Sequence, residues 1–249
     1  MSLPPPSPRL GVYLLPNLFT TASLFSGFLA VLWAVSGRFE NCALAILFSA
    51  VMDVLDGQIA RLTNTASDFG VQYDSLCDLA AFGLAPAVMI YYWQLESLGR
   101  LGIGAAFLFA ACGALRLARF NATASAGAKK HFVGMPIPGA ACCLATLVLF
   151  YQNIPAFLLP SFQYICLVFT VILAFLMVSR VRYASIKEYG VLKTHPFRTM
   201  VALILLFACI ISEPRLLGFL LCLAYLIAGL VHTFIVIPRR SRRILNNPT

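Results

Sequence analysis

Long apolar stretches alternate with short polar connections along almost the whole chain. At about 1.5 Å of rise per residue, each stretch can approach or cross the roughly 30 Å hydrocarbon core of a bilayer as an α-helix. The pattern predicts an all-α, polytopic membrane helix bundle with about eight transmembrane helices. These helices are expected at residues 14–36, 41–63, 73–95, 101–119, 135–152, 156–179, 197–212 and 215–237. The fifth and seventh are short and flanked by proline, so totals of six or seven stay open.

The composition strengthens the membrane interpretation. The 249 residues are 61% hydrophobic and 11% charged, with a mean hydropathy of +0.89, whereas a soluble domain has about 45–50% apolar and about 25% charged residues. The length suits one integral domain. The start, MSLPPPSPRLG, lacks the features of a cleavable signal, so residues 1–12 are expected to form a disordered cytosolic leader. The eight cysteines show no metal-binding spacing, which argues against a zinc site or a disulfide framework.

The basic residues favour one side of the membrane. If eight helices span it, 15 of the 18 lysines and arginines lie on the side of the two termini, and Arg38, Arg100 and Arg215 lie on the other. The positive-inside rule then places the termini in the cytosol. Topology and attraction to anionic headgroups account for the net charge of +9, so no nucleic acid partner is expected.

The acidic residues are the informative ones, because all five aspartates lie within 26 consecutive residues around the first predicted cytosolic hairpin. Four of them fall at the cytosolic ends of the second and third helices, and an uncompensated carboxylate inside a bilayer costs about 2.5–3.5 kcal/mol. Asp53 and Asp56 are three positions apart and Asp74 and Asp78 four, so each pair shares one helix face. A short hairpin lets the two faces meet, and the resulting cage of carboxylate oxygens suits Mg²⁺, Mn²⁺ or Ca²⁺ rather than zinc.

The residues around the aspartates favour a phosphate ligand over a purely structural role. Arg61 adds a positive charge whose fork can bind phosphate, and Gly57 and Ala60 keep the helix surface low, so that a bulky ligand can approach. The alternative is a set of interhelical salt bridges, but four aspartates beside one arginine leave about three negative charges that need cations from outside. Asp68 lies in the hairpin itself, where a solvated or helix-capping role is expected.

The spacing of these residues resembles the signature of the CDP-alcohol phosphatidyltransferase family. The pattern runs Asp53-x-x-Asp56-Gly57-x-x-Ala60-Arg61, then eight residues, Gly70, three residues, Asp74, three residues and Asp78, and it matches all eight fixed positions of the signature. The resemblance implies a six-helix membrane core over residues 13–180, with additional C-terminal transmembrane helices at 181–237 and a basic cytosolic tail at 238–249. It also implies a homodimer.

The same resemblance implies roles for individual residues. Two divalent ions, Mg²⁺ or Mn²⁺ with Ca²⁺ as an alternative, would be held by Asp53, Asp56, Asp74 and Asp78, and Asp78 would also be the catalytic base. The CDP-linked lipid would be bound by Asn17, Thr20, Asp53, Gly57, Ala60 and Arg61. Two metals can stabilise the attacking and leaving oxygens of an in-line displacement, the base takes the proton of the acceptor hydroxyl, and CMP leaves.

Two further stretches bear on the acceptor alcohol. RLARFN at 116–121 and FVGMPIPGA at 132–140 resemble segments of the bacterial, serine-using branch of the family. The expected reaction therefore transfers the phosphatidyl group of CDP-diacylglycerol to the hydroxyl of L-serine in the inner membrane of a bacterium, with the active site facing the cytosol. The expected acceptor-binding residues are Arg116, Arg119 and Asn121, because an arginine fork can bind the carboxylate of serine. Glycerol 3-phosphate, inositol and choline stay open as acceptors.

Other classes of membrane protein fit the pattern less well. A membrane prenyltransferase also binds a metal pyrophosphate through aspartates, but with a different spacing. A transporter or channel lined with aspartates would spread them through the membrane depth, whereas these lie at one end. A purely structural membrane protein has no use for a metal cage. Release of CMP from CDP-diacylglycerol, with and without divalent metal, separates these classes.

Overall fold

The computed structural model describes residues 10–63, 68–125, 134–179, 181, 213–231 and 233, and these residues form helices and short connections without a strand. The long helices are α1 (Leu10–Val35), α2 (Phe39–Thr63), α5 (Arg100–Ser125), α6 (Ile137–Phe150), α7 (Phe162–Val178) and α10 (Pro214–Val231). Between α2 and α5 lies a composite helix of α3 (Asp68–Asp78), η1 (Leu79–Leu84), α4 (Ala85–Ile90), η2 (Tyr91–Leu95) and η3 (Glu96–Leu98). Short 3₁₀ turns, η4 (Tyr151–Asn153) and η5 (Ala156–Ser161), join α6 to α7.

The lengths of these helices confirm a polytopic, all-α membrane bundle. The segments long and apolar enough to cross a membrane are Asn17–Val35, Phe39–Ile59, Phe69–Leu98, Arg100–Thr123 and Ala156–Val178. Two shorter apolar segments, Ile137–Asn153 and Arg215–Val231, match the predicted fifth and eighth spans. The predicted span at 197–212 and the tail at 238–249 lie outside the described residues, so the total of eight stays a prediction. Of the expected leader, residues 1–9 are also outside, and α1 already begins at Leu10.

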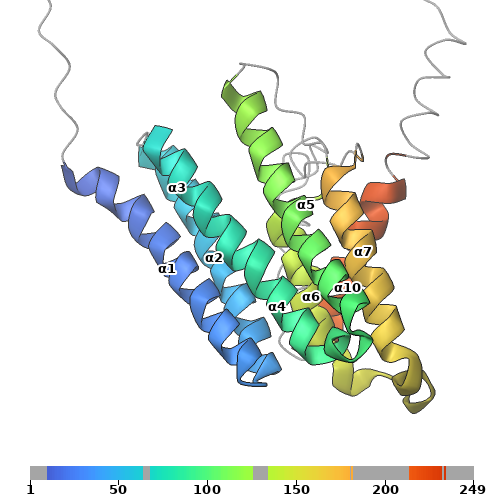
Figure 1. Ribbon diagram of the computed structural model, residues 1–249. Helices are drawn as coiled ribbons and strands as arrows, with labels where there is room; N and C mark the ends of the chain where they lie inside the picture. The colour runs from blue at the N-terminus through green and yellow to red at the C-terminus, as the bar shows by residue number, and fades with distance from the viewer. Residues whose placement is uncertain are drawn as a thin grey trace, which may run out of the picture.

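The helices lie side by side, with α1, α2 and α3 on one side of the bundle and α5, α6, α7 and α10 on the other (Figure 1). Neighbours α1 and α2 pack along their length, and the composite helix lies against both. Helix α6 occupies the middle, where it contacts α2, the composite helix and α10, and α7 lies against α5. This arrangement brings the second half of α2 next to α3, which are the two segments that carry the aspartates.

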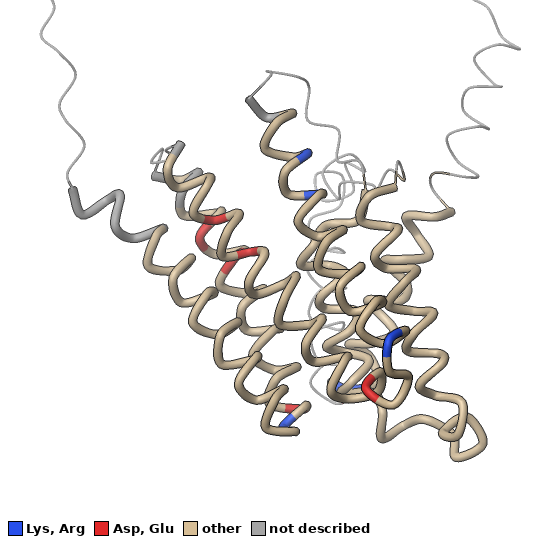
Figure 2. Tube along the Cα trace, in the orientation of Figure 1, with Lys and Arg blue, Asp and Glu red and all other residues tan. Residues whose placement is uncertain are grey.

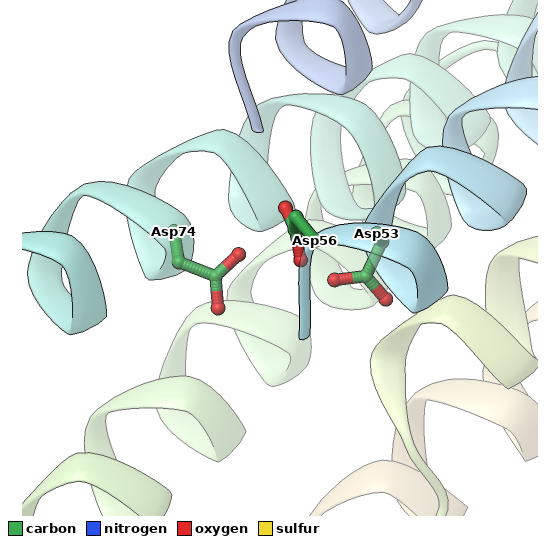
Figure 3. Close-up of side chains that lie close together, drawn as sticks. All are labelled: Asp53, Asp56 and Asp74. Atoms are coloured by element: carbon green, nitrogen blue, oxygen red, sulfur yellow. The ribbon is translucent and has the colours of Figure 1, made fainter. Parts of the chain in front are cut away.

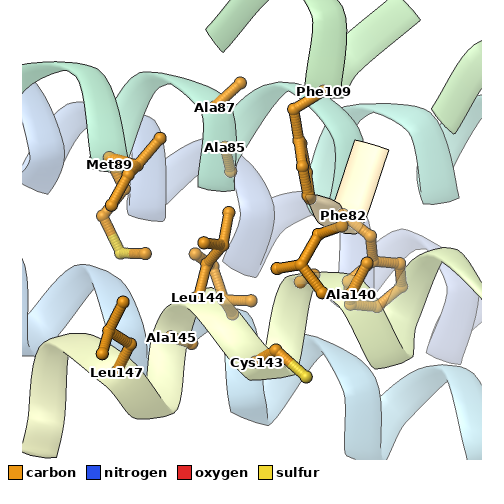
Figure 4. Close-up of a cluster of buried hydrophobic side chains, with 14 of the residues drawn as sticks. Phe82, Ala85, Ala87, Met89, Phe109, Ala140, Cys143, Leu144, Ala145 and Leu147 are labelled. Atoms are coloured by element: carbon orange, nitrogen blue, oxygen red, sulfur yellow. The ribbon is translucent and has the colours of Figure 1, made fainter. Parts of the chain in front are cut away.

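The core lies between the composite helix, α5 and α6 (Figure 4). Phe82, Met89, Phe109 and Leu144 have no exposed surface, and alanines fill the spaces between them. Lipid chains are as apolar as these side chains, so helices in a bilayer associate through close packing rather than through the hydrophobic effect. Small residues permit that packing, because they let the backbones approach.

Gly27 brings α1 and the composite helix together, backbone against backbone. A Cβ added at Gly27 would lie 2.6 Å from the Cα of Ala81 and 2.8 Å from its Cβ, well inside the roughly 3.5–4.0 Å optimum for carbon atoms. Ala81 belongs to η1, which begins directly after Asp78. This contact therefore holds the part of the composite helix that carries the aspartates tightly against α1.

The composite helix departs from regular α geometry, which the hydrophobic pattern does not predict. Two π-helical stretches, η1 and η2, interrupt it, and Pro86 follows the first of them. Proline has no backbone N–H, and its ring crowds the carbonyl four residues earlier, so a wider turn accommodates it. A widened turn contains an extra residue and rotates the side chains that follow. The direction in which the Asp78 side chain points is therefore independent of the direction in which the later core side chains point.

Replacement of Gly27 by alanine is expected to destabilise the bundle. The new methyl group has no room against Ala81, and overpacking of this kind costs about 1–3 kcal/mol. Gly104→Ala is the matched control, because nothing lies within 4 Å of its added Cβ and alanine favours a helix interior over glycine by about 1 kcal/mol. Thermal unfolding in detergent should show a lower midpoint for Gly27→Ala than for the native protein. The midpoint of Gly104→Ala should not fall. Equal midpoints for the two variants would contradict the close approach.

Candidate active site

Three carboxylates meet where α2 and α3 face each other (Figure 3). Asp53 and Asp56 come from α2 and Asp74 from α3, and each offers an oxygen within 4.8 Å of the other two. Oxygen ligands lie about 2.0–2.6 Å from Mg²⁺ or Ca²⁺, so two ligands of one ion are at most roughly 5 Å apart. The donor set fits a hard divalent cation. The convergence of these three aspartates, expected from their spacing, is present in the structure.

Helix α1 supports the cluster from its side. Asp56 is 5% exposed, and its Oδ2 accepts a hydrogen bond of 2.8 Å from the Thr20 hydroxyl. The backbone amide of Gly57 also donates to this carboxylate. A carboxylate held by two donors keeps one orientation, and it can still offer its other lone pairs to a cation. Thr20 therefore contacts a metal-ligand candidate directly, rather than only lining the nucleotide site expected for it.

Asp78 lies one helical turn from Asp74, next to the three-carboxylate cluster but not within it. Its carboxyl group is within hydrogen-bonding reach of Asp53. It also interacts electrostatically with Arg116 of α5. Asp78 thus lies near both a candidate metal ligand and a basic residue, and it is outside the cluster that the other three aspartates form.

Among the described side chains, no salt bridge forms at this end of the bundle, and the side chain of Arg61 lies outside them. Within the described part of the chain, the ion pair that forms joins Arg215 and Glu40 at 3.3 Å, at the end opposite the aspartates. Figure 2 shows the acidic positions in the second half of α2 and in α3, and the basic positions in the second half of α5, toward one end of the bundle. No described basic side chain forms an ion pair with the four aspartates. Their charge therefore calls for a cation from outside.

Arg116 is the basic residue best placed to receive a ligand. It lies on α5 and is half-buried. Its Nε is buried, and no described residue accepts a hydrogen bond from it. A buried guanidinium N–H without an acceptor is costly, so a bound anion would lower its free energy.

The other two expected acceptor residues have different surroundings. Arg119 is exposed, and its Nη1 donates to the carbonyl of Val178, at the end of α7, at 3.0 Å. The amide nitrogen of Asn121 donates to the Ser75 hydroxyl at 2.9 Å, which ties α5 to α3 one residue from Asp74. Arg119 thus joins α5 to α7, and Asn121 joins α5 to α3.

The remaining nucleotide-site candidates lie along α1 and α2. Asn17 is one turn before Thr20 on α1, and Gly57 follows Asp56 on α2. Helix α2 continues through Ala60 and Arg61, whose side chains are outside the described part of the structure. The four positions occupy the same end of the bundle as the aspartates.

The sequence reasoning missed a polar contact between α1 and α3 beside the cluster. The Thr21 hydroxyl donates to the carbonyl of Asn17 at 2.7 Å and lies 3.0 Å from the phenol oxygen of Tyr73. Tyr73 in turn stacks on Phe69, with 6.0 Å between the ring centroids. The available signals were the second threonine of LPNLFTT and the position of Tyr73 directly before Asp74.

Comparison with known proteins agrees with this geometry. The sequence model of the CDP-alcohol phosphatidyltransferase family matches residues 13–176. The CDP-diacylglycerol–serine O-phosphatidyltransferase of Helicobacter pylori is 41% identical over 177 residues, which cover 71% of this chain and 74% of that protein. The proteins of the same name from Methanocaldococcus jannaschii and Bacillus subtilis are each 33% identical. Their matches cover 85% and 71% of this chain and 90% and 93% of the respective relatives.

The family match includes α1, α2, the whole composite helix and α5, which are the elements that build the site. The chain therefore belongs to the CDP-alcohol phosphatidyltransferase family of membrane transferases.

Proposed function

We propose that the protein transfers the phosphatidyl group of CDP-diacylglycerol to the hydroxyl of L-serine, with phosphatidylserine and CMP as products. The relatives named as serine O-phosphatidyltransferases support the two substrates. The observation that carries the chemistry is the approach of Asp53, Asp56 and Asp74 to within 4.8 Å of one another, with Asp78 one turn away. Such a site suits transfer of a group bonded through a charged diphosphate.

Asp53, Asp56, Asp74 and Asp78 would hold two divalent ions, Mg²⁺ or Mn²⁺, with Ca²⁺ as an alternative. When bound, such ions neutralise the diphosphate and stabilise the oxygen that leaves with CMP. Thr20 fixes the orientation of Asp56 through its hydrogen bond of 2.8 Å. Asn17, Gly57, Ala60 and Arg61 complete the proposed site for the CDP moiety.

Asp78 is the proposed general base. It lies beside Asp53 and faces Arg116, so a serine hydroxyl placed between the metal ligands and Arg116 would approach its carboxylate. The serine oxygen attacks the phosphorus of the phosphatidyl group, and the bond from phosphorus to the CMP oxygen breaks. Asp78 accepts the proton that the serine hydroxyl loses.

Arg116 is the proposed partner of the serine carboxylate, because its buried Nε has no described acceptor. A carboxylate can receive two parallel hydrogen bonds from a guanidinium fork. Arg119 and Asn121 would contribute by holding α5 against α7 and α3 through their bonds to Val178 and Ser75. Direct contact of either side chain with serine is the alternative that mutagenesis separates.

The proposed setting is the inner membrane of a bacterium, with the site facing the cytosol and the chain forming a homodimer. The bias of basic residues toward the aspartate end supports the orientation. Single cysteines at Thr123 and Ser36 test it, because each native hydroxyl only caps a carbonyl of its own helix. Thr123→Cys should react with a membrane-impermeant thiol reagent added from the cytosolic side, and Ser36→Cys should react from the opposite side. Reaction of each cysteine from the other side would refute the orientation.

The proposed homodimer is tested by chemical crosslinking of the protein in membranes.

Removal of metal is expected to abolish activity. CMP release by the purified protein should stop with EDTA and return with Mg²⁺ or Mn²⁺, because the carboxylates alone repel a diphosphate. Asp56→Asn should lose metal and nucleotide binding together, whereas Glu96→Gln, at the opposite end of the bundle, should leave both unchanged. Full turnover in chelator would remove the metal-dependent mechanism.

Loss of the proposed base should affect turnover more than binding. Asp78→Asn is expected to bind CDP-diacylglycerol nearly as well as the native protein, while kcat falls about 10²–10⁴-fold, the usual contribution of a general base. Calorimetric titration and CMP release measure the two effects. A parallel collapse of binding would show that Asp78 is chiefly a metal ligand.

Loss of Arg116 should affect serine selectively. A charge-assisted hydrogen bond contributes about 1.5–3 kcal/mol, so Arg116→Ala should raise the serine KM by about 10–150-fold and leave the KM of CDP-diacylglycerol nearly unchanged. Arg119→Ala should instead lower thermal stability, because it removes the bond to Val178. Serinol, which lacks the carboxylate, should be a poor substrate of the native protein, and the difference between serine and serinol should shrink in Arg116→Ala. CMP release driven by glycerol 3-phosphate, inositol or choline but not by serine would overturn the acceptor.

A further inference from the structure

Helix α10 lies beyond the residues that the family model matches, yet it packs on the core through one face. Its contacts recur every three or four positions, as expected for a helix that presents a single stripe to its neighbour. They involve Arg215, Gly218, Phe219, Cys222 and Tyr225. This stripe runs along α6 from the end opposite the aspartates toward the end that contains the site.

Three contacts fix the position of α10 along α6. At its start, Arg215 pairs with Glu40 at 3.3 Å and also donates to the Gln152 side chain. One turn on, the rings of Phe219 and Phe150 stack with centroids 4.8 Å apart. After a further turn, the carbonyl of Cys222 lies 3.9 Å from the Cys143 sulfur. With these positions fixed, helix geometry determines where the next turn lies.

The next turn carries Tyr225, which reaches the start of α6 beside Arg116. A Cβ added at Gly139 would lie 3.6 Å from the Tyr225 ring, so the glycine leaves the ring room against α6. Tyr225 and Arg116 lie close enough to interact electrostatically. Arg116 therefore lies within electrostatic range of both the Asp78 carboxyl group and the Tyr225 phenol.

The proximity of Arg116 to both groups affects how its guanidinium can bind a carboxylate. A guanidinium binds a carboxylate well only when its fork points at the ligand, and an unrestrained arginine loses side-chain entropy on binding. Asp78 alone would attract the charge toward the metal ligands. A phenol oxygen near the guanidinium can accept a hydrogen bond from it and hold its plane, because buried tyrosines usually pair their hydroxyl with a polar partner.

We propose that Tyr225, delivered by the C-terminal helix α10, is a positioning residue that orients Arg116 toward the carboxylate of the acceptor. The proposal rests on the proposed function, because it assumes that the acceptor carries a carboxylate. It assigns part of acceptor selection to a helix outside the family-matched segment. Tyr225 itself performs no chemical step.

The test is Tyr225→Phe, which keeps the ring against Gly139 and removes the hydroxyl. The serine KM should rise about tenfold, in the range of one hydrogen bond to a charged group, while kcat and the KM of CDP-diacylglycerol change by less than about twofold. Discrimination between serine and serinol should shrink in the same variant. Tyr164→Phe, on the exposed face of α7, is the matched control and should change neither quantity.

A double-mutant cycle separates positioning from mere packing. In an Arg116→Ala background, or Arg116→Met if the alanine variant does not fold, Tyr225→Phe should have no further effect on the serine KM. Additive effects, an unchanged serine KM in Tyr225→Phe, or an equal loss in all parameters together with a lower melting point would each overturn the proposal. Absence of serine-dependent CMP release from the native protein would overturn the proposed function and this inference with it. Serine-dependent release with an unaltered Tyr225→Phe variant would overturn this inference alone.

Discussion

The rest of the structure depends on the requirement that carboxylates inside a membrane bundle be compensated. Asp53, Asp56, Asp74 and Asp78 lie in helices that span a bilayer, and no described basic residue pairs with them. Each would destabilise its helix if left uncompensated. A bound cation removes that cost, so the same arrangement that would be unfavourable in an empty bundle becomes a binding site. The fold therefore has to bring oxygens from two helices to a common point.

Close packing of small residues makes that convergence possible. Gly27 allows the composite helix to lie directly against α1, and α1 in turn supplies the Thr20 hydroxyl that holds Asp56. The π-helical turn after Asp78 lets the aspartate-bearing part face α2 while the following turns face α5 and α6. The packing of the helices and the geometry of the site therefore depend on each other. A displacement of α1 would alter both the contact with Ala81 and the orientation of Asp56.

The sequence predicted the features that depend on local periodicity and failed where non-adjacent helices meet. Spacings of three and four residues fix shared helix faces, so the convergence of Asp53, Asp56 and Asp74 was predictable, as was the all-α membrane fold. The π turns, the bond from Arg119 to Val178 and the approach of Tyr225 were not. A membrane helix is apolar around its whole circumference, so hydrophobic periodicity does not reveal which face meets which neighbour.

The difference between the aspartate cluster, which follows from local periodicity, and the contacts between non-adjacent helices bears on how the acceptor alcohol is selected. In the proposed reaction the aspartates act on the diphosphate, which is present whatever alcohol attacks, so they would not distinguish one acceptor from another. Discrimination would have to come from groups that contact the alcohol beyond its hydroxyl, and the groups proposed for this role belong to α5 and α10. On this proposal, a change in α10 would alter acceptor preference without disturbing the proposed metal ligands. Because Arg116 interacts electrostatically with both Asp78 and Tyr225, the proposed mechanism couples recognition of the acceptor and removal of its proton through one guanidinium.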